Sequence, residues 1–550
     1  MFENDWRDVW NGAEPSEPVG AVFTKPEVTA FILDLAGYSV QPGFRLASRR
    51  LLEPSCGDGA FITIAIERLL ASELQEIGQI DWDSAQIDAA VRACDVNSAF
   101  VAIAREKTAE MLCTHGCPRG RAAALAERWI EHADFLLKHW RERFDFVVGN
   151  PPYVRIEEIP VSVMSRYREL YQTCGDRADL YVAFFEQGLR LLSADGILAF
   201  ICANRFAKNQ YGRSLRQFIA QEFRVRFYVN LEHTQPFVSD VSAYPCVIVI
   251  DRLRGEGAHA VSLDSVEPEV LDQLVRERSL PAGGVWSHFP EWYPDGAPWV
   301  ATNREEFLEH AGLAERFPVL EESGRGTRVG IGVATGNDDV FISPGLMPEI
   351  EAECQLPLVM AADVSAEAVR WSGHYLINPH EHSAESKLRD LSRYPGLRAY
   401  FEKHRAALAK RHTARKQPDF WFRTIDRVNF PLAGAPKLLL PDIQAGGVIG
   451  HTSGAWYPQH NLYWITSEEW NLAALQALLR SSFVLRQVRK VSVQMRGGSV
   501  RYQAQVLRQL RIPRYQSLRP ELVSALASVG SSSDQCRIDE LAAEAFNQRA

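Results

Sequence analysis

Short apolar runs alternate with longer amphipathic stretches over residues 20–252. The short runs have the length and composition of strands, and the longer stretches carry apolar residues at helical spacing. This alternation predicts an α/β fold, in which a parallel sheet has helices on both faces. The predicted strands are 50–53, 91–95, 144–148, 196–202, 225–229 and 246–250, and the predicted helices are 61–76, 96–112 and 180–192.

The pattern changes towards the end of this region. Only the loop 231–245 separates the last two predicted strands, so we expect them to run antiparallel. We therefore place a first domain at 1–252, followed by a Gly-, Pro- and Trp-rich junction at 253–299. Short β runs with glycine turns then predict a mixed α+β domain over 300–520, and 521–550 predict a helical tail.

The composition is that of a soluble globular protein. At roughly 150 residues per domain, the length of 550 residues is enough for several domains. No apolar run approaches the roughly 18 residues of a membrane span, and the N-terminus lacks a signal-peptide pattern. Nine scattered cysteines, an odd number, do not predict a disulfide framework, so we expect a cytoplasmic protein.

The charge is distributed unevenly along the chain. The net charge is −9, but residues 387–519 hold 23 Lys and Arg against 7 Asp and Glu, which leaves −25 for the remainder. Residues 471–519 contain ten basic residues and no acidic one. Such a block is typical of a surface that binds a polyanion. The alternative is a solvated basic face.

A glycine turn follows the first predicted strand, in the sequence EPSCGDGAF that begins at Glu53. Gly57 and Gly59 would allow the backbone to approach a ligand, and the following helix offers free amides. Ile62 stands where a dinucleotide-binding motif needs a third glycine. Glu53 favours a cationic group over a phosphate. An ordinary tight turn is the alternative.

Two acidic residues lie further along this region, and the first of them closes the predicted strand 91–95. Asp95, before Val96, can bind the two hydroxyls of a ribose. Asp134 can accept from an adenine amine while Phe135 stacks on the ring. Each alone could be a surface carboxylate. Together they describe an adenosine with a charged, non-phosphate tail, which fits S-adenosylmethionine.

The tetrapeptide Asn150-Pro151-Pro152-Tyr153 follows an apolar strand, where α/β enzymes place their chemistry. The prolines fix the backbone, so that the Asn150 side chain and the Pro151 carbonyl form a rigid pair of acceptors. Accepting both N–H groups of a planar amine frees its lone pair for attack. Tyr153 can stack on the ring that carries the amine. The alternative is a Pro-rich turn with an exposed Tyr.

With these motifs in this order, residues 20–252 resemble the gamma class of DNA methyltransferases, which modify adenine at N6 in type II restriction–modification systems. The resemblance implies a Rossmann-like methyltransferase sheet. It also implies that Thr24 and Pro26 lie near the methionine part of the cofactor. In many family members the Thr and Pro are adjacent, whereas Lys25 separates them in this chain. The cofactor residues it implies are Thr24, Pro26, Glu53, Pro54, Cys56, Gly57, Gly59, Asp95, Val96, Asp134 and Phe135.

The same resemblance implies that Asn150–Tyr153 act on an adenine extruded from duplex DNA. Tyr153 and Phe237 would sandwich that base; the alternative for Phe237 is a core aromatic. Residues 300–520 resemble the specificity domains of such enzymes. The candidate DNA contacts are Arg496, Arg501, Arg508 and Arg511, which either read bases or only position the duplex.

We find no nuclease-type cluster and no convincing metal-ligand spacing, including the CTHGC segment at 113–117. We therefore expect no metal, a separate cognate restriction endonuclease as a conceivable partner, and a monomer by family analogy. Three alternatives stay open: an RNA or protein-glutamine methyltransferase, an N4-cytosine methyltransferase, and a non-catalytic DNA-binding subunit of a defence complex.

Overall fold

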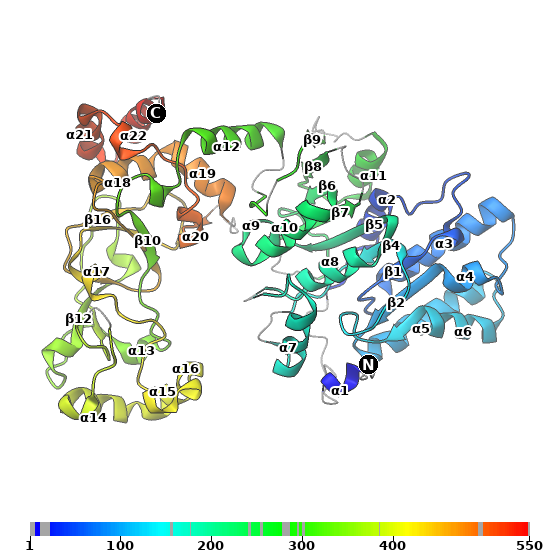
Figure 1. The fold of residues 1–550 in the computed structure, drawn as a ribbon, viewed down its shortest axis with the longest axis horizontal. Coiled ribbons are helices and arrows are strands. Elements are labelled where there is room, and N and C mark those ends of the chain that lie inside the picture. Colours follow the sequence, from blue (N-terminus) through cyan, green and yellow to red (C-terminus); the bar gives the residue numbers. More distant parts are fainter. Residues whose placement is uncertain are drawn as a thin grey trace. The chain divides into compact units, whose positions relative to one another are not determined.

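The chain divides into two units, Met1–Leu308 and Glu309–Ala550 (Figure 1). Both come from a computed structural model. The ranges that it describes are 6–10, 22–154, 158–175, 178–239, 244–252, 257–277, 286–293, 296–299, 303–383, 386–492 and 499–547.

A nine-stranded sheet forms the centre of the first unit. Its first five strands in space are parallel to one another, as the βα alternation predicts. Leu51 of the central strand pairs with Val91 on one side and with Phe146 on the other. In spatial order these strands are β3 (Ile130–His132), β2 (Val91–Asp95), β1 (Leu51–Glu53), β4 (Phe144–Gly149) and β5 (Leu192–Ala203).

The other half of the sheet is mixed. The predicted antiparallel pairing of the last two strands is confirmed, with Val247 opposite Val229. Within 253–299, expected to be a junction, residues 258–262 and 287–289 instead extend this sheet. His259 pairs in parallel with Phe227 and so covers what would be an open edge. The strands are β7 (Pro245–Asp251), β6 (Arg224–Asn230), β8 (Ala258–Ser262) and β9 (Ser287–Phe289).

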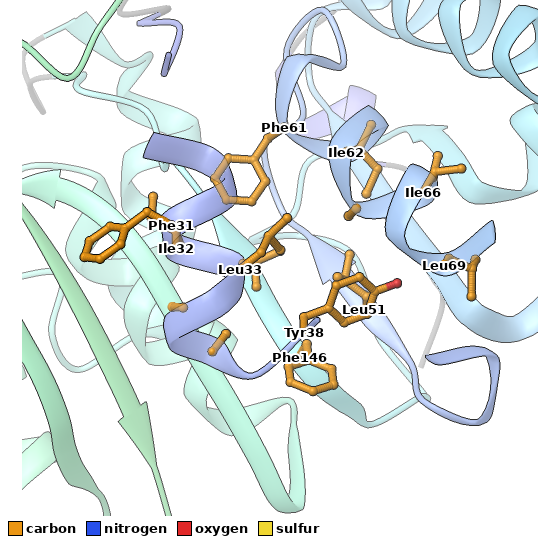
Figure 2. Close-up of a cluster of buried hydrophobic side chains, with 14 of the residues drawn as sticks. Phe31, Ile32, Leu33, Tyr38, Leu51, Phe61, Ile62, Ile66, Leu69 and Phe146 are labelled. Atoms are coloured by element: carbon orange, nitrogen blue, oxygen red, sulfur yellow. The ribbon is translucent and has the colours of Figure 1, made fainter. Parts of the chain in front are cut away.

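Helices cover both faces of the sheet, which confirms the predicted α/β fold. On one face, Figure 2 shows Leu33 of α2 on the side of Phe61, with Tyr38 beside Phe146. On the opposite face Gly188 packs so closely that a Cβ there would lie 2.8 Å from Leu198. The helices are α1 (Trp6–Val9), α2 (Pro26–Ala36), α3 (Ala60–Ile77), α4 (Ala85–Ala90), α5 (Ser98–Thr114), α6 (Arg119–Trp129), α7 (Val161–Leu170), α8 (Tyr181–Arg190), α9 (Arg205–Lys208), α10 (Arg213–Glu222) and α11 (Pro268–Glu277).

The second unit is built from small sheets and short helices, in agreement with the predicted α+β character. Two four-stranded sheets have the orders β10-β18-β14-β16 and β11-β13-β12-β17, and β15 pairs with β19. The strands are β10 (Arg328–Ile331), β11 (Ile342–Ser343), β12 (Gln355–Val359), β13 (Tyr375–Ile377), β14 (Lys437–Pro441), β15 (Ile443–Gln444), β16 (Gly450–Thr452), β17 (Tyr457–Pro458), β18 (Leu462–Thr466) and β19 (Val500–Arg501).

The predicted C-terminal tail is part of this second unit. It forms α21 and α22, and both of them contact α18. Among the described residues, no helix has the length and hydropathy needed to cross a membrane. The helices are α12 (Arg304–Arg316), which starts in the first unit, α13 (Asp338–Phe341), α14 (Pro395–Lys403), α15 (Arg405–Ala409), α16 (His412–Lys416), α17 (Phe430–Gly434), α18 (Leu472–Arg480), α19 (Ser482–Val491), α20 (Ala504–Leu507), α21 (Pro520–Val529) and α22 (Gln535–Asn547).

Candidate active site

A cavity of about 440 Å³ lies in the first unit, where β1, β2 and β4 end. That volume is in the range of sites for small organic ligands. In the described part of the chain, no group of three or more His, Cys, Asp or Glu side chains could hold a metal ion. The predicted site residues that line the cavity are Thr24, Glu53, Pro54, Cys56, Gly57, Asp95, Val96, Asp134, Phe135, Asn150, Pro151, Pro152 and Tyr153.

The glycine turn after β1 is tied to the end of β2. The Gly57 amide, at φ +53°, donates to Asp95 Oδ2 at 2.9 Å, and the Asn97 amide donates to Asp95 Oδ1 at 2.9 Å. Burial raises the pKa of Asp95, while these hydrogen bonds oppose that rise. Each carboxylate oxygen retains a further lone pair, so the side chain can still accept from a ligand hydroxyl.

Glu53 is an uncompensated acid in the wall of the cavity. Its side chain is 1% exposed, and Oε2 has no hydrogen-bond partner among the residues described. Burial raises the pKa of Glu53 well above its usual range, and the nearby charges of Asp95 and Asp58 raise it further. Such a carboxyl group is stabilised when a cationic group enters the cavity.

Asp134 is saturated with donors in this structure. The backbone amides of Leu136 and Leu137 donate to Oδ1 at 2.8 and 3.2 Å. The Trp10 indole and the Tyr167 hydroxyl donate to Oδ2 at 2.9 and 2.5 Å. Sequence reasoning missed both side chains, which lie 124 and 33 residues away along the chain without any local signal. An adenine amine must therefore share or displace one of these donors to reach Asp134.

The orientation of the Asn150 amide is fixed by its neighbours. Nδ2 donates to the Val22 carbonyl at 2.7 Å and to Thr24 Oγ1 at 3.2 Å. A carbonyl can only accept, so nitrogen must face Val22 and oxygen must face away. Asn150 Oδ1 is buried and has no donor among the described residues. The Asn150 side chain thus holds an acceptor without a donor among the described residues, and Asn150 and Pro151 both line the cavity.

Tyr153 and Phe237 are in contact but do not form a parallel sandwich. Their ring centroids are 6.0 Å apart and the planes make an angle of 79°. Phe237 is 2% exposed, belongs to the hydrophobic core and pairs through its backbone with Thr24. It is absent from the cavity wall described here. The structure therefore places Phe237 in the hydrophobic core, as the alternative interpretation of its role expects.

Two other predicted cofactor residues lie off the cavity wall as described. Gly59 caps α3 at φ +87°, and a Cβ there would lie 3.1 Å from both Cα and Cβ of Ala104. Its glycine is thus explained by the close packing of α3 on α5. Pro26 is the first residue of α2, a position where its missing amide is not needed.

Several basic residues of the acid-free block 471–519 have partners elsewhere in the second unit. Arg496 and the glycines after it lie outside the described residues. The other predicted DNA contacts have partners within the protein, so the block carries less free charge than its composition indicates. The ion pairs and hydrogen bonds join Lys490 to Glu309, Arg501 to Asp442, Arg508 to Glu321, Arg511 to the Phe317 carbonyl, Arg514 to the Glu322 carbonyl and Arg519 to Glu544.

Comparison with known proteins gives the site its context. Residues 72–237 match the family model of the Eco57I restriction-modification methylase. The type II methyltransferase M.PaeR7I of Pseudomonas aeruginosa is 42% identical, with 92% of this chain and 89% of the relative covered. The chain belongs to the type II methyltransferases.

A second type II methyltransferase, M.XhoI of Xanthomonas vasicola, is 37% identical over 94% of this chain and 95% of its own length. The fold also matches a solved structure of the type IIL restriction-modification enzyme MmeI in complex with DNA. That match has a TM-score of 0.58 at 14% identity, and covers all of this chain and 76% of the other. This type II methyltransferase therefore shares its fold along the whole chain with a restriction-modification enzyme.

Proposed function

We propose that this type II methyltransferase transfers a methyl group from S-adenosylmethionine to the N6 amine of adenine in duplex DNA. The observation that carries the proposal is the fixed orientation of Asn150, whose Oδ1 is a buried acceptor without a donor among the described residues. With the Pro151 carbonyl it can accept both N–H groups of a planar amine. Accepting them draws the nitrogen towards sp³ geometry and makes its lone pair available.

The residues around the cavity fit the proposed cofactor. When bound, S-adenosylmethionine supplies an electrophilic methyl group on a sulfonium. Glu53, buried and with an unpartnered oxygen among the described atoms, suits the cationic part of that molecule. Asp95 suits the ribose hydroxyls, and Asp134 suits the adenine amine once a donor gives way. The presence of all three in the lining of one cavity supports an adenosine with a charged tail as the ligand.

Duplex DNA is the proposed methyl acceptor. A base within a duplex cannot reach a buried acceptor pair, so the target must be extruded, at a cost of a few kcal/mol. Tyr153 supports this step, because its ring contributes to the cavity wall beside Asn150. In a restriction–modification system this methylation protects the modified site from cleavage by a cognate endonuclease. We propose the first unit as the catalytic domain and the second as the recognition domain.

The test is to incubate the protein with unmethylated bacterial DNA and S-adenosylmethionine, and then to analyse the nucleosides by mass spectrometry. N6-methyladenine establishes the reaction and the base together. N4-methylcytosine would keep the chemistry and overturn the base. No modified DNA base from a protein that binds the cofactor would overturn the DNA proposal, and would redirect the search to RNA or to protein glutamine.

A further inference from the structure

The second unit carries an uncompensated basic segment, residues 403–427. It contains eight Lys and Arg against two Asp, whereas the whole unit Glu309–Ala550 holds 29 basic and 25 acidic residues. The segment lies outside the acid-free block from which the candidate DNA contacts come. Its charge is therefore a separate feature of the surface.

Five basic side chains of this segment differ in their partners from several basic side chains of the block 471–519. Lys403, Lys410, Arg415, Lys416 and Arg427 are exposed. No acidic side chain within the described residues lies within ion-pair distance of any of the five. By contrast, Lys490, Arg501, Arg508 and Arg519 each have an acidic partner.

The segment is held on a rigid base. The Arg411 guanidinium, half-buried, donates to the carbonyls of Thr335, Trp421 and Arg423 at 2.8–2.9 Å. The Ala334 amide donates to Asp426 Oδ2 at 2.9 Å, and the Asp426 amide donates back to the Ala334 carbonyl at 3.1 Å. These bonds fasten the turns around α16 to the loop before α13, so the exposed cations project from a fixed backbone.

Four of the five free cations lie at consecutive helix ends. Lys403 ends α14, Lys410 follows α15, and Arg415 and Lys416 end α16. These helices contact each other in sequence, and Figure 1 shows them together at one end of the second unit. Phe420, which is 46% exposed, lies in the short turn 418–420 that comes after α16. The surface thus combines unpaired cations with an exposed aromatic ring.

We propose that Lys403, Lys410, Arg415, Lys416 and Arg427 form a contact surface for the phosphate backbone of duplex DNA. The inference rests on the proposed function and adds the place of contact. Fixed, uncompensated cations release counterions when they meet phosphates, which yields sequence-independent affinity. Phosphate contacts of this kind set the position of a duplex, while base contacts made elsewhere carry the specificity.

A structural role for the same residues makes a different prediction. Basic side chains in the last turn of a helix stabilise that helix through its dipole. If this role is the only one, removing the basic side chains lowers the thermal midpoint of unfolding. The protein that remains folded then binds DNA with the parent affinity. The two roles separate when stability and DNA binding are measured on the same variants.

The experiment replaces three cations in the full-length protein, as K410Q/R415Q/K416Q. Fluorescence anisotropy with a random 40-base-pair duplex gives the Kd across a salt series. Since each phosphate contact contributes roughly 0.9 to the slope of log Kd against log salt, the slope falls by about 2 to 3, and Kd at moderate salt rises roughly tenfold or more. Cofactor affinity and the thermal midpoint stay close to those of the parent.

A matched control removes three charges from the same unit at R325Q/R393Q/R537Q. These arginines are exposed and pair with Glu468, Asp390 and Glu540, so they offer no uncompensated charge. Equal losses in both variants, or an unchanged slope in the first, overturn the inference. Methylation of unmethylated bacterial DNA by the parent protein is scored separately, because its absence overturns the proposed function whatever the anisotropy shows.

Discussion

The Asn150 amide nitrogen lies 2.7 Å from the carbonyl oxygen of Val22, a residue 128 positions earlier in the chain. This bond fixes the orientation of the amide and leaves Oδ1 on the side away from Val22. Without it the side chain could rotate and present a donor, which would repel an incoming amine. The acceptor geometry at β4 therefore depends on the segment that leads into α2.

Replacing Asn150 by Ala tests the acceptor role. The variant loses Oδ1 but keeps Glu53, Asp95 and Asp134, so it should bind S-adenosylmethionine with nearly the parent Kd. We expect kcat to fall by about 10²–10³, the usual effect of removing one preorganised polar contact from a transition state. Calorimetry gives the Kd and a tritium-transfer assay gives kcat. Turnover at the parent rate would contradict the mechanism.

Glu53 should make cofactor binding dependent on pH. Burial holds the pKa of Glu53 high in the free protein, so the group is protonated to a higher pH than usual. A bound cation favours the ionised form and lowers that pKa, so binding releases a proton and affinity rises with pH until the free group ionises. Calorimetry in buffers of different ionisation enthalpy measures the release. Glu53→Gln should abolish the part of the proton release that comes from Glu53. An unchanged proton release in that variant would contradict the role of Glu53 in binding the cation.

Trp10 should compete with the cofactor for Asp134. Trp10→Phe keeps an aromatic ring but removes the indole donor, which leaves Asp134 Oδ2 with Tyr167 alone. We expect cofactor affinity to rise by about 0.5–1.5 kcal/mol, roughly two- to tenfold, because one displaced hydrogen bond is no longer lost. If the variant instead binds the cofactor more weakly at unchanged stability, the Trp10 indole is part of the site that holds the bound cofactor.

Two glycines at the ends of α3 separate backbone strain from packing. Gly59 and Gly78 have similar angles, φ +87° and +80°, so alanine at either position costs about 1–2 kcal/mol for the left-handed backbone. Only Gly59 faces a neighbour, since a Cβ there would lie 3.1 Å from Ala104, and nothing lies within 4 Å at Gly78. Gly59→Ala should therefore lose about 1–3 kcal/mol more than Gly78→Ala in urea unfolding. Equal losses would leave the packing explanation without support.

The parallel half of the sheet and its ligand-facing ends were predictable because their signals are local. An apolar run followed by Gly57 and Gly59, or by Asn150 and two prolines, indicates a strand that ends in a turn. β3 was missed because Ile130–His132 is only three residues long and directly follows a helix. β8 and β9 were missed because short strands among Gly and Pro are hard to distinguish from a linker.

Contacts between distant segments could not be predicted from the sequence. The donors on Asp134 come from Trp10 and Tyr167, and no spacing rule connects the three positions. The counter-charges of the acid-free block are equally remote, as the pair between Lys490 and Glu309 shows. Counting charges along a segment therefore overstates how many of its basic side chains lack an acidic partner.

The pairing of Thr24 with Phe237 has a consequence for dividing the protein into pieces. It ties Phe237, the last residue of the matched family region, to Thr24, which lies before that region, and α2 packs in turn on α11. A piece ending at residue 252 would lose α11 and uncover Phe31 and its neighbours. Dissection of the chain into separately expressed halves should therefore cut beyond residue 277, near the boundary at Leu308.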